Sequence, residues 1–290
     1  MGLNIVFGID TTTAAAISGI LGILLFASPK MGGVLDNTAK VLGTVMLVLI
    51  GYVAFSTNPP VAEAATHAIV PTNYPWLATI TLIGGTVGGY ITFSGGHRLI
   101  DAGITGREHL KDVRRAAFMG MSVDAIVRIL LFLAVLGVVS MGFALDPKDP
   151  AGSAFLLGAG EIGHKLFGIV FFCAALTSVV GAAYTSVSFL KTLFKVVERY
   201  EKLTIMAFIF VSTCILIFIG KPATLLIVAG SVNGLILPVT LAVMLLATRK
   251  TNIVGDYKHN PVLFYTGWIV VLVTAYIGVT SLQGIAKLLG

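Results

Sequence analysis

The segment from Thr81 to Gly103, TLIGGTVGGYITFSGGHRLIDAG, is unusually rich in glycine for so apolar a stretch. Its first six glycines are Gly84, Gly85, Gly88, Gly89, Gly95 and Gly96. Each glycine costs a helix roughly 1 kcal/mol relative to alanine, so we expect the helix to break between Gly85 and Gly89. A break at membrane depth exposes carbonyl oxygens that bind cations. The alternative is close packing of helices, for which glycines four apart, such as Gly84 and Gly88, are suited.

Oxygen ligands of this kind favour a hard cation. Carbonyl and hydroxyl oxygens suit Mg²⁺ and Mn²⁺, whereas the soft thioether of methionine favours other transition metals. Mg²⁺ also keeps several of its water molecules, for which a glycine-lined space leaves room. We therefore expect a metal site at Gly85, Gly88 and Thr92 that prefers Mg²⁺ or Mn²⁺ to Fe²⁺.

Three further polar residues lie within apolar stretches, where charges are costly and commonly functional. Asp124 and Arg128 are four residues apart, on one face of a helix, so we expect an intramembrane pair. Such a pair either lowers the desolvation cost of both charges or takes part in coupling or gating. Asn233 precedes Pro238 by five residues and offers its amide oxygen either to a pathway or to a neighbouring helix.

The composition places the elements that carry these residues in a membrane. Of 290 residues, 57% are hydrophobic and 11% are charged, whereas a soluble domain carries about 25% charged residues. The predicted fold class is an all-α polytopic membrane protein, with one transmembrane domain over residues 1–290 and eight transmembrane helices, the third one broken. The expected spans are 10–27, 38–57, 76–95, 121–145, 162–190, 203–220, 223–247 and 262–283, and residues 59–75 are expected to form an outer connection.

The distribution of basic residues predicts the orientation of the chain. Fourteen of the 19 lysines and arginines fall on one side when the spans alternate, so the positive-inside rule places both termini outside. An outside N-terminus requires something to carry the first span across, and an odd number of upstream helices would do so. The net charge of +6 does not indicate nucleic acid, because these residues lie beside apolar runs, where they face anionic lipid headgroups. Membrane lipid is therefore the expected partner.

Three further segments, together with the glycine-rich one, resemble a known family. They are NIVFGID at 4–10, LFGIVFFCAALTSVVGAAYTSVSFL at 166–190 and IVGDYKHNPVLFYTGWIVVLV at 253–273. The chain is similar over nearly its whole length to the Nramp (natural resistance-associated macrophage protein) divalent-metal transporters, and in particular to their bacterial Nramp-related branch. This resemblance implies an integral protein of the bacterial plasma membrane that transports a divalent metal ion by alternating access, with that ion as substrate and without a bound cofactor.

The resemblance also implies a partial LeuT-like fold, in which the metal lies between two broken helices. The eight spans would match family helices four to eleven, and the three upstream helices, which carry the family's Asp-Pro-Gly-Asn motif, would be absent from this sequence. The family pattern Ala-x-x-Met-Pro-His aligns with Gly85, Gly88, Gly89 and Tyr90 at its alanine, methionine, proline and histidine. Because tyrosine titrates near pH 10, Tyr90 would not carry protons as that histidine does, so we expect weak or absent proton coupling.

The expected transport pathway comprises Gly89, Tyr90, Asn233 and His97. His97 falls where the third span leaves the membrane, either in an exit vestibule or in a solvated loop. The missing upstream helices are the expected protein partner, as part of a longer chain. Two alternatives stay open: an inactive or scaffold remnant that lacks half the site, and a symporter of amino acids or organic ions with the same architecture.

Overall fold

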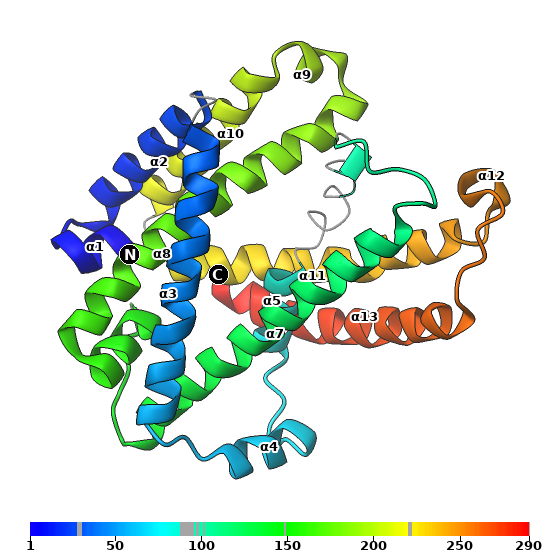
Figure 1. Cartoon of the computed structure of the whole chain (residues 1–290). Coiled ribbons are helices and arrows are strands. Elements are labelled where there is room, and N and C mark those ends of the chain that lie inside the picture. Colours follow the sequence, from blue (N-terminus) through cyan, green and yellow to red (C-terminus); the bar gives the residue numbers. More distant parts are fainter. Residues whose placement is uncertain are drawn as a thin grey trace. The chain divides into compact units, whose positions relative to one another are not determined.

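The computed structural model describes residues 1–27, 31–87, 96, 99–100, 102–147, 149–219 and 222–289. Within these ranges every regular element is a helix (Figure 1). The helices are α1 (Gly2–Phe7), α2 (Thr11–Ala27), α3 (Met31–Ser56), α4 (Val61–Ile69), α5 (Trp76–Val87), α7 (Leu110–Ser140), α8 (Pro150–Leu193), α9 (Lys195–Arg199), α10 (Glu201–Ile219), α11 (Pro222–Ala247), α12 (Thr251–Val254) and α13 (Pro261–Leu289).

Five helices in the described part of the chain are long and apolar enough to cross a membrane. These stretches are Leu110–Ser140, Pro150–Leu193, Glu201–Ile219, Thr224–Ala247 and Pro261–Thr280. A sixth candidate is the bent pair of Val41–Ser56 and Val61–Ile69, whose axes differ by 102°. The α2 helix and the described part of α5 are apolar but shorter, with 17 and 12 residues. The chain is thus a polytopic α-helical membrane protein, and the number of eight spans stays a prediction.

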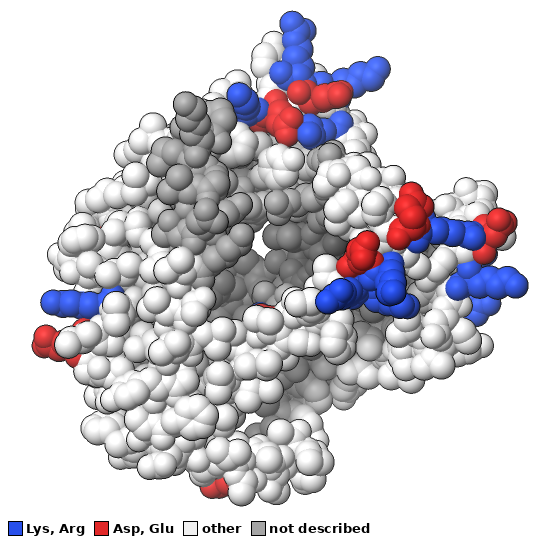
Figure 2. Space-filling view, in the orientation of Figure 1, with Lys and Arg blue, Asp and Glu red and all other residues white. Residues whose placement is uncertain are grey.

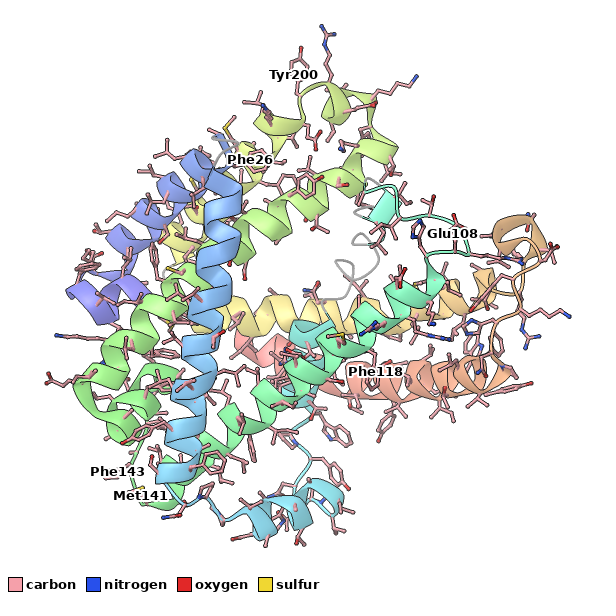
Figure 3. All side chains as sticks on the ribbon, viewed as in Figure 1. Phe26, Glu108, Phe118, Met141, Phe143 and Tyr200 are labelled. Atoms are coloured by element: carbon pink, nitrogen blue, oxygen red, sulfur yellow. The ribbon has the colours of Figure 1, made fainter. Side chains whose placement is uncertain are left out.

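Large apolar side chains cover the outer faces of these helices. Phe118, labelled on α7 in Figure 3, is 69% exposed, and Phe218 on α10 is 87% exposed. Apolar surface of this kind is a liability in water but is normal against lipid. Figure 2 shows Lys and Arg side chains gathered over α9 and over the connection that contains α12. These two clusters of charge therefore lie at helix ends, as expected for a chain that crosses a bilayer.

The helices form two compact units, of which the first comprises Met1–Thr72 and Ala102–Gly220. One part of its core lies where α3 meets α7 and α8, and the fully buried side chains there include Ile50, Val138 and Phe155. The α8 helix changes direction at Gly160, which has φ 68° and ψ −171°. Only glycine adopts this conformation without steric cost, so Gly160 divides α8 into two helical segments.

The second unit comprises Asn73–Asp101 and Lys221–Gly290, and its helices α5, α11 and α13 pack on one another (Figure 1). Ile80 of α5 is completely buried in this packing. The ring of Trp76, at the start of α5, meets the ring of Tyr276 on α13 edge to face at 5.7 Å. These contacts fix the position of α5, on which the glycine-rich segment begins.

The structure adds detail to two expectations about local structure. The connection at 59–75 contains the nine-residue helix α4. The helix expected to break between Gly85 and Gly89 is helical as far as Val87, the last described residue of α5. The rest of the expected break, at Gly88 and Gly89, lies outside the described residues.

Candidate functional site

The α5 and α11 helices meet backbone to backbone at three glycines. A methyl group on Gly84 of α5 would overlap the carbonyl oxygen of Gly230 on α11. A methyl group on Gly234 would lie 2.6 Å from the carbonyl oxygen of Ile80, and one on Gly230 would lie 2.9 Å from that of Thr81. No side chain larger than hydrogen fits at these positions without displacing backbone. We call this contact the α5–α11 crossing.

Two hydroxyl groups join the helices at the α5–α11 crossing. The oxygens of Thr81 and Ser231 lie 2.8 Å apart, and Ser231 is fully buried. Each hydroxyl also lies 2.7 Å from a carbonyl oxygen of its own helix, that of Leu77 or of Ile227. Three oxygen–oxygen contacts share two hydroxyl protons, so one of the three contacts lacks a hydroxyl hydrogen of its own. The crossing is therefore rich in oxygen acceptors.

The α11 helix offers two further oxygen atoms beside this contact. Pro238 has no N–H, so the carbonyl of Gly234, four residues earlier, loses its usual helical donor. Asn233 is half-buried, and its side-chain amide has no hydrogen-bond partner among the residues that the structure describes. Polar groups at membrane depth that lack partners are costly, and proteins keep them where they line a cavity or meet a ligand.

The ligands that the α5–α11 crossing offers are electrically neutral. They are the hydroxyls of Thr81 and Ser231, the amide of Asn233 and the carbonyl of Gly234. No group of three or more His, Cys, Asp or Glu side chains comes together to hold a metal anywhere in the described ranges. A cation at the crossing would thus meet oxygen dipoles, which suit a hard ion that retains part of its water shell.

Only part of the predicted site falls on described residues. Gly85 lies in α5, and a methyl group on its Cα would have no neighbouring atom within 4 Å. Asn233 lies next to Gly234, whose backbone nitrogen would be close to a methyl group on Gly84. The remaining predicted metal and pathway residues, Gly88, Gly89, Tyr90, Thr92 and His97, lie outside the described residues.

The predicted intramembrane pair lies in the first unit, on α7. Arg128 donates from Nε to Oδ2 of Asp124 over 2.7 Å, and both side chains are about half exposed in the chain alone. The acidic residue precedes the basic one by four positions, which is the favourable order for such a pair in a helix. The two charges therefore satisfy each other locally on one helix.

Thr81, Ser231 and the glycines of α11 were not predicted as site residues. The available signal was the sequence Gly230-Ser-Val-Asn-Gly234, a pair of glycines four residues apart that favours close helix approach. For Gly84 the structure supports the helix-packing interpretation, because its neighbour is the backbone of α11.

Comparison with known proteins identifies the family. Residues 1–283 match the family described as "Natural resistance-associated macrophage protein-like", Nramp. The chain belongs to the Nramp family. Nramp proteins are a transporter family, so the function class is membrane transport of divalent metal ions.

Two bacterial relatives resemble this Nramp chain closely. An "Uncharacterized membrane protein" of Haemophilus influenzae is 50% identical over 275 residues, which cover 95% of this chain and 69% of the relative. The "Uncharacterized membrane protein YcsG" of Bacillus subtilis is 48% identical over 282 residues, which cover 97% of this chain and 70% of the relative. Both names agree with the membrane assignment that the apolar helices indicate.

Proposed function

We propose that this Nramp chain transports Mg²⁺ or Mn²⁺ in preference to Fe²⁺, by alternating access, along a pathway that passes the α5–α11 crossing. Two features of α11 carry the proposal: the amide of Asn233 has no hydrogen-bond partner among the described residues, and Pro238 has no N–H to donate to the carbonyl of Gly234. They lie on a helix held against the glycine-rich segment by backbone contact. An amide without a partner and a carbonyl without its usual helical donor are groups that suit a passing cation.

The preference for hard cations rests on the types of ligand present. The residues of α5 and those of α11 up to Pro238 include no methionine, cysteine or histidine. Soft metals gain most from sulfur and imidazole ligands, whereas Mg²⁺ and Mn²⁺ gain most from oxygen. Gly85, Gly88 and Thr92 complete the proposed metal site, and Gly89, Tyr90 and His97 extend the proposed pathway.

The same proposal includes the setting of the chain. The chain would lie in a bacterial plasma membrane with both termini outside. Tyr90 replaces the family's histidine, so transport would depend little on a proton gradient.

Uptake into proteoliposomes tests this proposal. We expect the 290-residue chain to take up Mg²⁺ or Mn²⁺ faster than Fe²⁺, with little change when a pH gradient is imposed. The Asn233→Ala substitution removes one oxygen ligand and should slow uptake about tenfold. This factor corresponds to a loss of about 1.4 kcal/mol in the free energy of interaction with the ion. The matched control is Asn252→Ala, which removes the same amide from an exposed position on α12. Faster uptake of Fe²⁺ than of Mg²⁺ and Mn²⁺, or equal effects of the two substitutions, would contradict the proposal.

A further inference from the structure

The connection between α11 and α13 contains a polar pocket that transport does not explain. This connection, residues 248–260, joins two stretches that qualify as membrane spans, Thr224–Ala247 and Pro261–Thr280. Because one span ends and the next begins there, the connection lies at the level of the lipid headgroups. The pocket has a volume of about 290 Å³, and its lining includes Thr248, Arg249, Thr251, Tyr257, Lys258 and His259.

The polar groups in this lining are mostly hydrogen-bond donors, and two of them are cations. The connection carries three basic residues, Arg249, Lys250 and Lys258, and one carboxylate, Asp256. Neither Arg249 nor Lys258 forms an ion pair with any carboxylate of the described residues. Two cations that share one pocket without a counter-ion repel each other, so an anion between them would be stabilised.

The chain holds one of these cations in place. The guanidinium carbon of Arg249 lies 4.1 Å from the centre of the Phe264 ring, on the first turn of α13. Such cation–π contact restricts the side chain while leaving its N–H groups free to bind oxygen. A donor that is already positioned loses less conformational freedom when it binds.

His259 belongs to the same lining. Its Nδ1 is the one buried side-chain nitrogen or oxygen without a hydrogen-bond partner in the part of the chain that the structure describes. The neighbouring Tyr257 ring packs against the His259 ring, 6.1 Å between centres, and Tyr257 also lines the pocket. An imidazole and a phenol beside two cations extend the set of groups that recognise oxyanions.

We propose that this pocket binds a phosphate group. An oxyanion with several acceptor oxygens matches an arginine, a lysine and hydroxyl donors, and arginine in particular recognises phosphate through two parallel hydrogen bonds. The connection lies at the level of the lipid headgroups, so the phosphate group would come from the phosphodiester of an anionic phospholipid. Basic residues beside a membrane span attract such lipids. A soluble phosphate would satisfy the same chemistry from the aqueous side.

The test uses the full chain in a phosphate-free, non-ionic detergent. Binding of phosphatidylglycerol is measured by native mass spectrometry and compared with binding of a diacylglycerol that has the same acyl chains but no phosphate. We expect phosphatidylglycerol to bind and the diacylglycerol not to bind. Millimolar inorganic phosphate should leave the lipid bound if the lipid is the natural source, whereas displacement by inorganic phosphate identifies a soluble phosphate as an equal ligand of the same site.

Two lysines provide the matched substitutions. Lys258→Gln removes a cation that lines the pocket and should weaken phosphatidylglycerol binding about tenfold, as expected for a charge-assisted hydrogen bond. Lys250→Gln removes the same charge from an exposed neighbour outside the lining and should change affinity less than about twofold. Lys258→Arg should keep binding, which separates loss of the phosphate contact from loss of the fold. Equal weakening by Lys258→Gln and Lys250→Gln, or equal binding of the diacylglycerol, would overturn the proposal.

Discussion

The hydroxyl oxygens of Thr81 and Ser231 lie 2.8 Å apart, although the residues are 150 positions apart in the sequence. The contact joins α5 to α11 at the point where glycines let the two backbones touch. Hydrogen bonds between membrane helices contribute about 0.6 kcal/mol on average, so this one adds specificity to an interface that packing already holds. It also keeps two oxygen atoms next to the proposed pathway.

A double-mutant cycle measures the energy of this hydroxyl pair. Thr81→Val and Ser231→Ala each remove one hydroxyl, and the coupling between them should be about 0.6 to 1.7 kcal/mol by unfolding in detergent. Thr266→Val is the control, because the Thr266 hydroxyl bonds only to carbonyls of its own helix, α13. Strictly additive effects of Thr81→Val and Ser231→Ala would show that the pair does not interact.

Adjacent glycines on α5 should respond in opposite ways to the same substitution. Gly84→Ala forces a methyl group into the backbone of α11 and should destabilise the chain by about 3 kcal/mol. Gly85→Ala meets open space and should leave the stability unchanged or raise it by up to about 1 kcal/mol, because alanine favours the helix. Thermal unfolding in detergent compares the two variants. Similar losses of stability would argue against the α5–α11 crossing.

Pro238 should matter for transport more than for folding. Pro238→Ala restores a backbone N–H that can occupy the carbonyl of Gly234, so we expect slower metal uptake with stability retained. Pro150→Ala serves as the control, because Pro150 begins α8, where a proline costs no helical hydrogen bond. Unchanged uptake by the Pro238→Ala variant would remove the Gly234 carbonyl from the pathway.

The Asp124 and Arg128 pair allows a test by exchange. If the pair only neutralises two charges on α7, Asp124→Asn and Arg128→Gln should each lower stability, because each leaves one charge unpaired. The exchanged double variant, Asp124→Arg with Arg128→Asp, should then recover most of the stability, although its order on the helix is less favourable. Metal uptake that stays low after stability has recovered would instead indicate a role in coupling or gating.

The sequence was sufficient to predict those helices that depend only on the length of an apolar stretch. The predicted span at 203–220 agrees with α10, Glu201–Ile219, and the predicted span at 223–247 agrees with α11, Pro222–Ala247. Both stretches are long and predominantly apolar, and a helix satisfies all backbone groups of such a stretch within the stretch itself. The nine residues of α4 are too few to stand out in a window of about 19 residues, so that helix was missed.

The candidate site was harder to predict, because it depends on contacts between distant segments. Asn233 stood out as a polar residue within an apolar run, and Asp124 with Arg128 stood out by helical spacing. Nothing local to Thr81 indicates that it meets Ser231, since hydroxyls occur throughout these helices and mostly bond to their own backbone. The role of Gly84 likewise could not be predicted without knowing which segment packs against it. A glycine suits a helix break and a close contact between helices equally well.

The close approach at Gly84, Gly230 and Gly234 also constrains how the second unit moves. With carbonyl oxygens seated against opposing Cα atoms, α5 has no clearance to rotate about its axis or to slide along α11. A displacement of either helix during a conformational cycle must therefore carry the other with it. The α5 and α11 helices therefore behave as a single rigid element within the second unit.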